Sequence, residues 1–268
     1  MLAQSKNGPV RIVQVTDPHL FMNRKGQLLG LDTEHSFTSV LDLVSKEQPD
    51  FDLMLMTGDL SQDGSVAAYQ RLEELVKPFN KPYYWFCGNH DNRENMAEVA
   101  KSSGAMTSVV RQGNWQLILL DSSVPGEVHG NLAQDQLDIL SNALNERPDL
   151  HTLVSLHHHP IEMKSQWIDT IGVKNSAEFL QILNAHNNVK AVLWGHVHQA
   201  LDVERNGIRF FSTPSSCVQF TPKSDEFDVD TEAPGYRWLE LNDDGSINSA
   251  VSRVEGIEFT IDYSVKGY

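Results

Sequence analysis

Residues 83–91 read Tyr83-Tyr84-Trp85-Phe86-Cys87-Gly88-Asn89-His90-Asp91, an apolar run that ends in an amide, an imidazole and a carboxylate. The apolar run predicts a buried strand, so these polar groups would stand at its end. Four other apolar runs end in similar groups, namely Asp17-Pro18-His19, Gly58-Asp59, His157-His158-His159-Pro160 and Gly195-His196-Val197-His198. Open α/β sheets bind ligands at the carboxyl ends of their strands, so five such ends in one sheet could converge on one polar site.

The first two thirds of the chain alternate between short apolar runs and amphipathic stretches. The apolar runs predict strands at 11–15, 53–56, 83–87, 115–120, 153–156 and 189–194. Apolar residues spaced three and four positions apart predict helices at 34–47, 69–79, 94–101, 137–144 and 179–183. Two hairpins should follow, pairing 201–204 with 208–212 and 236–241 with 247–254. This order predicts an α/β fold in which two sheets pack face to face with helices outside.

The length of 268 residues, with 40% hydrophobic residues, is compatible with a single compact domain that spans 1–268. Residues 213–235 are the exception, because they are acidic, contain proline and show no periodicity. A segment of that length without an element of its own is usually a functional lid or disordered, and we favour a lid loop. The acidic residues 225–232 within it are interpreted as a solvated loop rather than a third metal site.

Charge and composition exclude several classes of partner. The net charge of −15 and the lack of a basic stripe argue against nucleic acid. A small anionic substrate remains compatible, because bound cations would invert the local field. No apolar run is long enough for a membrane span or a signal peptide, so we expect a cytoplasmic protein with no membrane partner. In that reducing compartment, Cys87 and Cys217 are expected to be buried thiols.

The polar groups at the five strand ends are typical metal ligands. Asp17, Asp59 and Asn89 supply oxygen donors, and the histidines supply imidazoles, whereas no thiolate is among them. This donor set suits manganese, iron or zinc. Seven protein ligands exceed what one ion uses, which favours a two-metal site. A single Asp-x-His or Gly-Asp pair would be weak evidence, since both occur at ordinary turns.

The ordered motifs D-x-H, G-D, G-N-H-D, H-x-x-P and G-H-x-H, spanning 17–198, resemble the calcineurin-like metallophosphoesterases. Residues 12–21, 156–160, 217–220 and 233–235 resemble the bacterial class III cyclic-AMP phosphodiesterases of that family. The resemblance implies a four-layer α/β/β/α sandwich of two mixed sheets and two divalent metal ions, iron or manganese first and zinc as an alternative. It also implies hydrolysis of 3′,5′-cyclic AMP to 5′-AMP by a metal-bridging hydroxide.

Two alternatives to this activity remain open. One is a phosphodiesterase for other small diesters, such as glycerophosphodiesters or 2′,3′-cyclic nucleotides, because the metal motifs do not specify the leaving group. The other is a scaffold without activity, which is disfavoured because no motif position is degraded. The sequence does not distinguish a monomer from a homodimer.

The resemblance assigns roles residue by residue. Asp17, His19 and His198 would hold the first metal, Asn89, His157 and His196 the second, and Asp59 would bridge them. His90 would be catalytic, stabilising charge on the phosphoryl group or protonating the leaving oxygen. Asp91 or Asp63 would orient His90. The residues implied to contact the substrate are His19, Asp59, Asn89, His90 and His198.

The triple histidine and the segment 213–235 leave questions open. Residues of an extended segment alternate faces, so His157 and His159 should point one way and His158 the other. The family pattern favours His157 over His158 as the ligand, and His159 stands where many relatives carry proline. In the later segment, Gln219 and Phe220 are candidates to read the purine, with simple packing of the sheet edge as the alternative. His35, His129, His151 and His186 match no motif and are expected to be structural.

Overall fold

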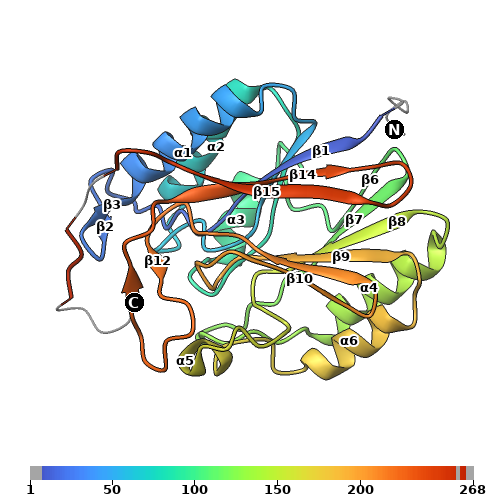
Figure 1. The fold of residues 1–268 in the computed structure, drawn as a ribbon. Coiled ribbons are helices and arrows are strands. Elements are labelled where there is room, and N and C mark those ends of the chain that lie inside the picture. The colour runs from blue at the N-terminus through green and yellow to red at the C-terminus, as the bar shows by residue number, and fades with distance from the viewer. Residues whose placement is uncertain (1–7, 258–259, 264–268) are drawn as a thin grey trace.

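Two mixed β-sheets form the centre of the computed structural model, which describes residues 8–257 and 260–263 (Figure 1). The first sheet runs β15-β14-β1-β4-β5, with bounds Ile247–Arg253, Gly235–Leu241, Val10–Val15, Leu53–Met56 and Tyr83–Trp85. The second runs β10-β11-β9-β8-β7-β6, with bounds Leu201–Arg205, Ile208–Ser212, Val189–Trp194, His151–Ser155, Trp115–Leu119 and Val109–Gln112. In the first sheet, β1, β4 and β5 are parallel, and the antiparallel strands β14 and β15 are added on one side. In the second sheet, the four inner strands are parallel and both edge strands, β10 and β6, are antiparallel.

Helices cover the outer faces of both sheets. The first sheet packs against α1 (Thr33–Glu47), α2 (Val66–Val76) and α3 (Arg93–Val99), through a core that includes Phe37, Val40 and Val13. The second packs against α4 (Gln134–Glu146) and α6 (Ser176–Asn184). Between the sheets lies a third apolar cluster that includes Ile12, Leu55 and Leu193. The predicted four-layer α/β/β/α sandwich is confirmed.

The helix α1 shows how the sequence produces these layers. Its residues Phe37, Val40, Leu41 and Val44 are spaced to lie on one face, and all four are buried. The Asp32 side chain accepts a hydrogen bond from the amide of His35, which caps the first turn. The helix ends at Glu47, one residue before the pair Gln48-Pro49 that was expected to stop it.

Some elements differ from the expectation. The strand expected at 83–87 ends at Trp85, because Phe86 and Cys87 already turn towards the polar loop. After α2, residues Lys77–Phe79 form a separate 3-10 turn. Elements not predicted are β2 (Gln27–Leu28), β3 (Leu31–Asp32), β6, α5 (Gln166–Asp169), β12 (Gln219–Phe220) and β13 (Val229–Asp230). The expectation that 213–235 has no element of its own is therefore wrong, since β12 and β13 pair within it.

The five strand ends do converge, but they come from two sheets rather than one. β1, β4 and β5 of the first sheet and β8 and β9 of the second carry the polar motifs at their carboxyl ends. The two sheets contact each other directly there, since the ring nitrogen Nδ1 of His157 lies 2.8 Å from the carbonyl oxygen of Thr57. In the described part of the chain, no helix is both long and apolar enough to cross a membrane.

A buried polar bridge joins the sheets behind this junction. The side-chain amide of Gln14, on β1, donates to Thr57 Oγ1 at 2.8 Å and to the carbonyl oxygen of Trp194 at 3.3 Å. Its carbonyl oxygen accepts a hydrogen bond from the hydroxyl of Thr213. Gln14 is completely buried, so water cannot take its place as the hydrogen-bond partner of these groups. The bridge thus fixes β1 relative to β9 directly beneath the loops that carry the polar motifs.

Replacing Gln14 with leucine should lower the free energy of unfolding by about 1–3 kcal/mol, because buried partners are left without hydrogen bonds. Denaturant titration followed by circular dichroism measures this loss. The matched control is Gln70→Leu on the exposed face of α2, which should change stability by less than about 0.5 kcal/mol. Equal stabilities of the two variants would show that the bridge does not hold the sheets together.

Candidate metal centre

The backbone at the candidate site adopts a conformation that side chains usually avoid. Positive φ angles occur at Asp17 (51°), His19 (46°), Asp59 (49°), His196 (64°) and His198 (49°). Left-handed non-glycine residues are uncommon and cluster at functional sites, where the surrounding structure over-determines them. These five motif residues are half of the ten described non-glycine residues with positive φ.

Asp17, His19 and His198 form the first donor set, and all three are fully buried. Nε2 of His198 lies 3.3 Å from Asp17 Oδ1 and 3.3 Å from Nε2 of His19. The other ring nitrogen of each histidine contacts an oxygen atom of the surrounding protein. Nδ1 of His19 lies 2.6 Å from Gln62 Oε1, and Nδ1 of His198 lies 2.8 Å from a backbone carbonyl oxygen. Such partners fix the ring orientation and leave Nε2 for a metal ion.

The family resemblance assigns Asp59, Asn89, His157 and His196 to the second donor set, and the ring centroids of His157 and His196 lie 5.0 Å apart. His157 is held in the same way as the other two histidines, because its Nδ1 faces the carbonyl oxygen of Thr57. Asn89 Oδ1 and both ring nitrogens of His196 are buried without a hydrogen-bond partner, while Asp59 Oδ2 and His157 Nε2 are buried facing each other at 3.2 Å. Buried polar atoms are rarely left unpaired, so a cation is the natural partner for these atoms.

Asp59 lies between the two donor sets. Its Oδ2 is 3.2 Å from Nε2 of His157 and 3.9 Å from Nε2 of His19. The Asp59 carboxylate packs directly against Gly88, and a Cβ atom at residue 88 would collide with it. A single carboxylate with reach to both sets is the arrangement expected of a bridging ligand.

The charges of the metal-free site are coupled. Burial raises the pKa of Asp59, but the nearby His157 outweighs that effect and holds the pKa well below its usual value. Burial alone would lower the pKa of His157, but the negative charge of Asp59 has the larger effect and raises this pKa to about 9. His19 behaves differently, since burial lowers its pKa to about 3. At neutral pH the second donor set therefore holds a proton on His157, whereas His19 in the first is neutral.

The loop 88–91 is the open edge of the site. Asn89 and His90 are partly exposed, whereas the aspartate and histidine donors of both sets are buried. The backbone amide of His90 donates to Asp59 Oδ1 at 2.9 Å, and its ring lies 5.1 Å from that of His19. A substrate that approaches from solvent therefore meets His90 beside the donors.

Asp91 and Asp63 both make loop contacts. The carboxylate of Asp91 accepts hydrogen bonds from the amides of Leu60, Ser61 and Gly88, and from the hydroxyl of Tyr69. Asp63 accepts from the amides of Met22 and Ser65 and from the hydroxyl of Ser61. Asp91 therefore ties the loop after β5 to the loop after β4, a role that its place in the motif does not reveal.

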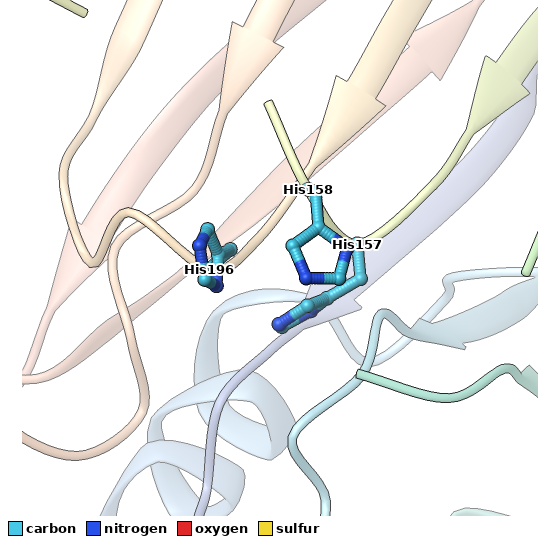
Figure 2. A group of neighbouring side chains, drawn as sticks. All are labelled: His157, His158 and His196. Atoms are coloured by element: carbon cyan, nitrogen blue, oxygen red, sulfur yellow. The ribbon is translucent and has the colours of Figure 1, made fainter. Parts of the chain in front are cut away.

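The triple histidine does not alternate faces as expected, because the backbone bends after Leu156 instead of continuing as a strand. The ring centroids of His157, His158 and His159 lie 5.0, 4.5 and 5.9 Å from that of His196. Figure 2 shows His157 and His158 facing His196 from the same segment of chain. Nε2 of His157 lies 3.2 Å from Asp59 Oδ2, and the ring of His158 packs beside those of His157 and His196.

The segment 213–235 covers the first donor set but does not offer a free aromatic face. The Phe220 ring stacks on His198 with centroids 4.3 Å apart and an angle of 6°, and it is only 2% exposed. The Gln219 amide donates to the carbonyl oxygens of Ser215 and Cys217. The interpretation that these two residues read a purine is therefore wrong, because packing within the protein already engages them.

The remaining expectations concern residues outside the site. The described clusters of candidate ligands do not include His35, His129, His151 or His186. The ring of His151, for example, packs against Trp115 with centroids 5.3 Å apart. Cys87 and Cys217 are buried and form no disulfide, as expected.

A divalent ion should bind the second donor set more tightly as the pH rises towards about 9, because it needs His157 without its proton. Binding at neutral pH should release about one proton per ion at that set. Chelator-competition titrations at several pH values, with calorimetry in buffers of different ionisation enthalpy, measure both effects. His19 in the first donor set provides an internal comparison, since burial lowers its pKa to about 3. A pH-independent affinity at the second set would contradict the prediction.

Comparisons with known proteins agree with this geometry. Residues 10–200 match the family model of the calcineurin-like phosphoesterases. The 3′,5′-cyclic adenosine monophosphate phosphodiesterase CpdA of Pseudomonas aeruginosa is 45% identical and covers 97% of this chain and 95% of its own length. The enzyme of the same name from Haemophilus influenzae is 42% identical, with 99% and 97% covered. A dimetal phosphatase from Danio rerio shares the fold, with a TM-score of 0.61 at 13% identity over 92% of this chain and 100% of that one. The chain therefore belongs to the calcineurin-like phosphoesterase family.

Proposed function

We propose that this protein hydrolyses 3′,5′-cyclic AMP to 5′-AMP at a dinuclear metal centre. The observation that carries the proposal is the cluster of aspartate and histidine donors around Asp59, in a chain 45% identical over nearly its full length to a phosphodiesterase named for this substrate. In this proposal residues 1–268 form one domain, in which 213–235 is a lid loop over the first donor set.

The two donor sets fit divalent ions with mixed oxygen and nitrogen ligands. Asp17, His19 and His198 would hold the first ion, Asn89, His157 and His196 would hold the second, and Asp59 would contribute to both. Iron or manganese suits these ligands best, with zinc as the alternative. When bound, the ions polarise the phosphoryl oxygens and activate water at neutral pH.

The remaining steps fall to the side chains around the ions. The residues assigned to contact the substrate phosphate are His19, Asp59, Asn89, His90 and His198. Water adds to phosphorus, the bond from phosphorus to the ribose 3′ oxygen breaks, and the 3′ oxygen takes up a proton. His90 is placed to donate that proton or to stabilise the developing charge, because it alone of these histidines is partly exposed.

Asp59→Ala should abolish hydrolysis of cyclic AMP and lower the bound metal below two ions per chain. The physical reason is that removing the shared carboxylate takes a donor from both sets. Metal content by inductively coupled plasma spectrometry, measured beside turnover, checks this outcome. Asp138→Ala, on the exposed face of α4, is the control and should retain both. An Asp59→Ala protein with two ions and normal turnover would refute the shared role.

His90→Ala should keep its metal and lose roughly 100- to 10,000-fold in the rate of cyclic AMP hydrolysis, the range typical of a lost general acid. The loss should shrink for bis(p-nitrophenyl) phosphate, because p-nitrophenolate leaves without needing a proton. His35→Ala, which alters an exposed histidine of α1, serves as the comparison. If both substrates lose the same factor, His90 does not act as the acid.

A further inference from the structure

Tyr69 is a tyrosine of α2 whose hydroxyl reaches the loop that carries Asn89 and His90. The residue is completely buried, and its ring packs in the apolar cluster between the helices and the first sheet. The hydroxyl donates to Asp91 Oδ1 at 3.0 Å and accepts a hydrogen bond from the backbone amide of Asn92 at 2.8 Å. The proposed mechanism gives Tyr69 no role.

The hydroxyl of Tyr69 is not needed for packing. Ala68, Leu72 and Val76, its neighbours on the buried face of α2, present only hydrocarbon to the same core. A buried hydroxyl costs free energy unless it finds hydrogen-bond partners, and a phenylalanine ring would fill the core without that cost. Burial and the adjacent Asp91 raise the pKa of Tyr69, so the hydroxyl keeps its proton and remains a donor. Its two hydrogen bonds to the loop therefore account for a tyrosine at this position.

The hydrogen bonds of Tyr69 and Asp91 hold both ends of the segment that contains residues 89–90. At one end, the backbone amide of Gly88 donates to Asp91 Oδ2 at 2.9 Å. At the other end, the amide of Asn92 donates to the Tyr69 hydroxyl, which in turn donates to Asp91 Oδ1. One connected network thus brackets the pair that supplies the amide donor and the proposed acid.

Tyr69 also connects this loop to a helix. The other described partners of the Asp91 carboxylate are backbone amides of the loops themselves, those of Leu60, Ser61 and Gly88. Two loops that bind only each other could shift together, whereas α2 is fixed against the first sheet by its buried face. The Tyr69 hydroxyl therefore sets the position of both loops relative to the core.

We propose that Tyr69 is a positioning residue for His90, which it acts on through the loop that its hydroxyl anchors. This inference rests on the proposed function, in which His90 donates a proton to the leaving oxygen or stabilises the developing charge. Both roles require the His90 ring at hydrogen-bond distance from the reacting atoms, and a displacement of about 1 Å can lower a rate by about 100-fold. Loss of the hydroxyl leaves the Asn92 amide without this partner and gives the loop freedom to move.

Tyr69→Phe removes the hydroxyl and keeps the ring. In the metal-loaded, full-length protein, kcat for cyclic AMP should fall by about 10- to 100-fold, because the loop no longer holds His90 in place. The Michaelis constant should change by less than about twofold, since the groups that bind the phosphate are retained. Steady-state kinetics with metal analysis of the same samples measure these values, and two ions per chain should remain bound.

A double-mutant cycle with His90→Ala separates positioning from a general loss of structure. If Tyr69 acts through His90, then Tyr69→Phe should lower the rate of a His90→Ala protein by less than about twofold. A change that merely loosens the fold would instead lower the rate by the same factor whether or not His90 is present.

Tyr83→Phe is the matched control. Tyr83 belongs to β5, and its hydroxyl donates to the carboxylate of Glu73 on α2, so this change also removes a hydroxyl that joins the same two regions. Its described partners do not include the loop 88–92, and kcat should therefore stay within about twofold of the unmodified value.

Asp91→Asn tests the same contact from the other side, because it replaces the carboxylate that accepts from the Tyr69 hydroxyl. It should show the same dependence on His90, and it remains informative if Tyr69→Phe does not fold. Circular dichroism and thermal unfolding establish that each variant is folded at the assay temperature.

The outcomes distinguish this inference from the proposed function. Unmodified, metal-loaded protein that fails to hydrolyse cyclic AMP would overturn the proposed function itself. Active unmodified protein, together with a Tyr69→Phe variant of unchanged kcat, would overturn only the role of Tyr69. Equal losses in the presence and absence of His90 would do the same.

Discussion

Two carboxylates, those of Asp17 and Asp59, are fully buried where the two sheets meet, and the loops around them are arranged to stabilise their charge. An isolated buried carboxylate costs several kcal/mol, so positive or hydrogen-bonding groups must surround it. Asp17 accepts hydrogen bonds from the backbone amide of His196, and Asp59 accepts one from the amide of His90 and faces His157. Loops from both sheets therefore contact these two side chains.

This constraint explains why the backbone is unusual where the donors lie. Asp17 and His19, like His196 and His198, are pairs of residues two positions apart that both have positive φ. Each such residue costs about 1–3 kcal/mol, which the surrounding contacts must offset. The polar bridge at Gln14 and the amide contacts of Asp91 supply part of that support. The result is a set of donors whose positions are fixed before any ion arrives.

The sequence predicts much of the fold, because the inner strands are continuous apolar runs. The strands at 53–56 and 189–194 have the predicted bounds, whereas β6, a short strand at a sheet edge, lacks such a run and is missed. The donor residues are recognisable because motifs mark them. Contacts between distant residues are not recognisable: nothing near Ser122 predicts that it holds His158, and nothing near Phe220 predicts that His198 occupies one of its faces.

The stack of Phe220 on His198 has a consequence for how solvent reaches the first donor set. Phe220 also packs edge-on against Trp167 and Phe227, so an aromatic wall built from α5 and the segment between β12 and β13 closes one side of the first donor set. The same donor set also borders the partly exposed loop 88–91, where the ring of His90 lies 5.1 Å from that of His19. The wall thus keeps solvent from one side of the first donor set and leaves the loop as its open side.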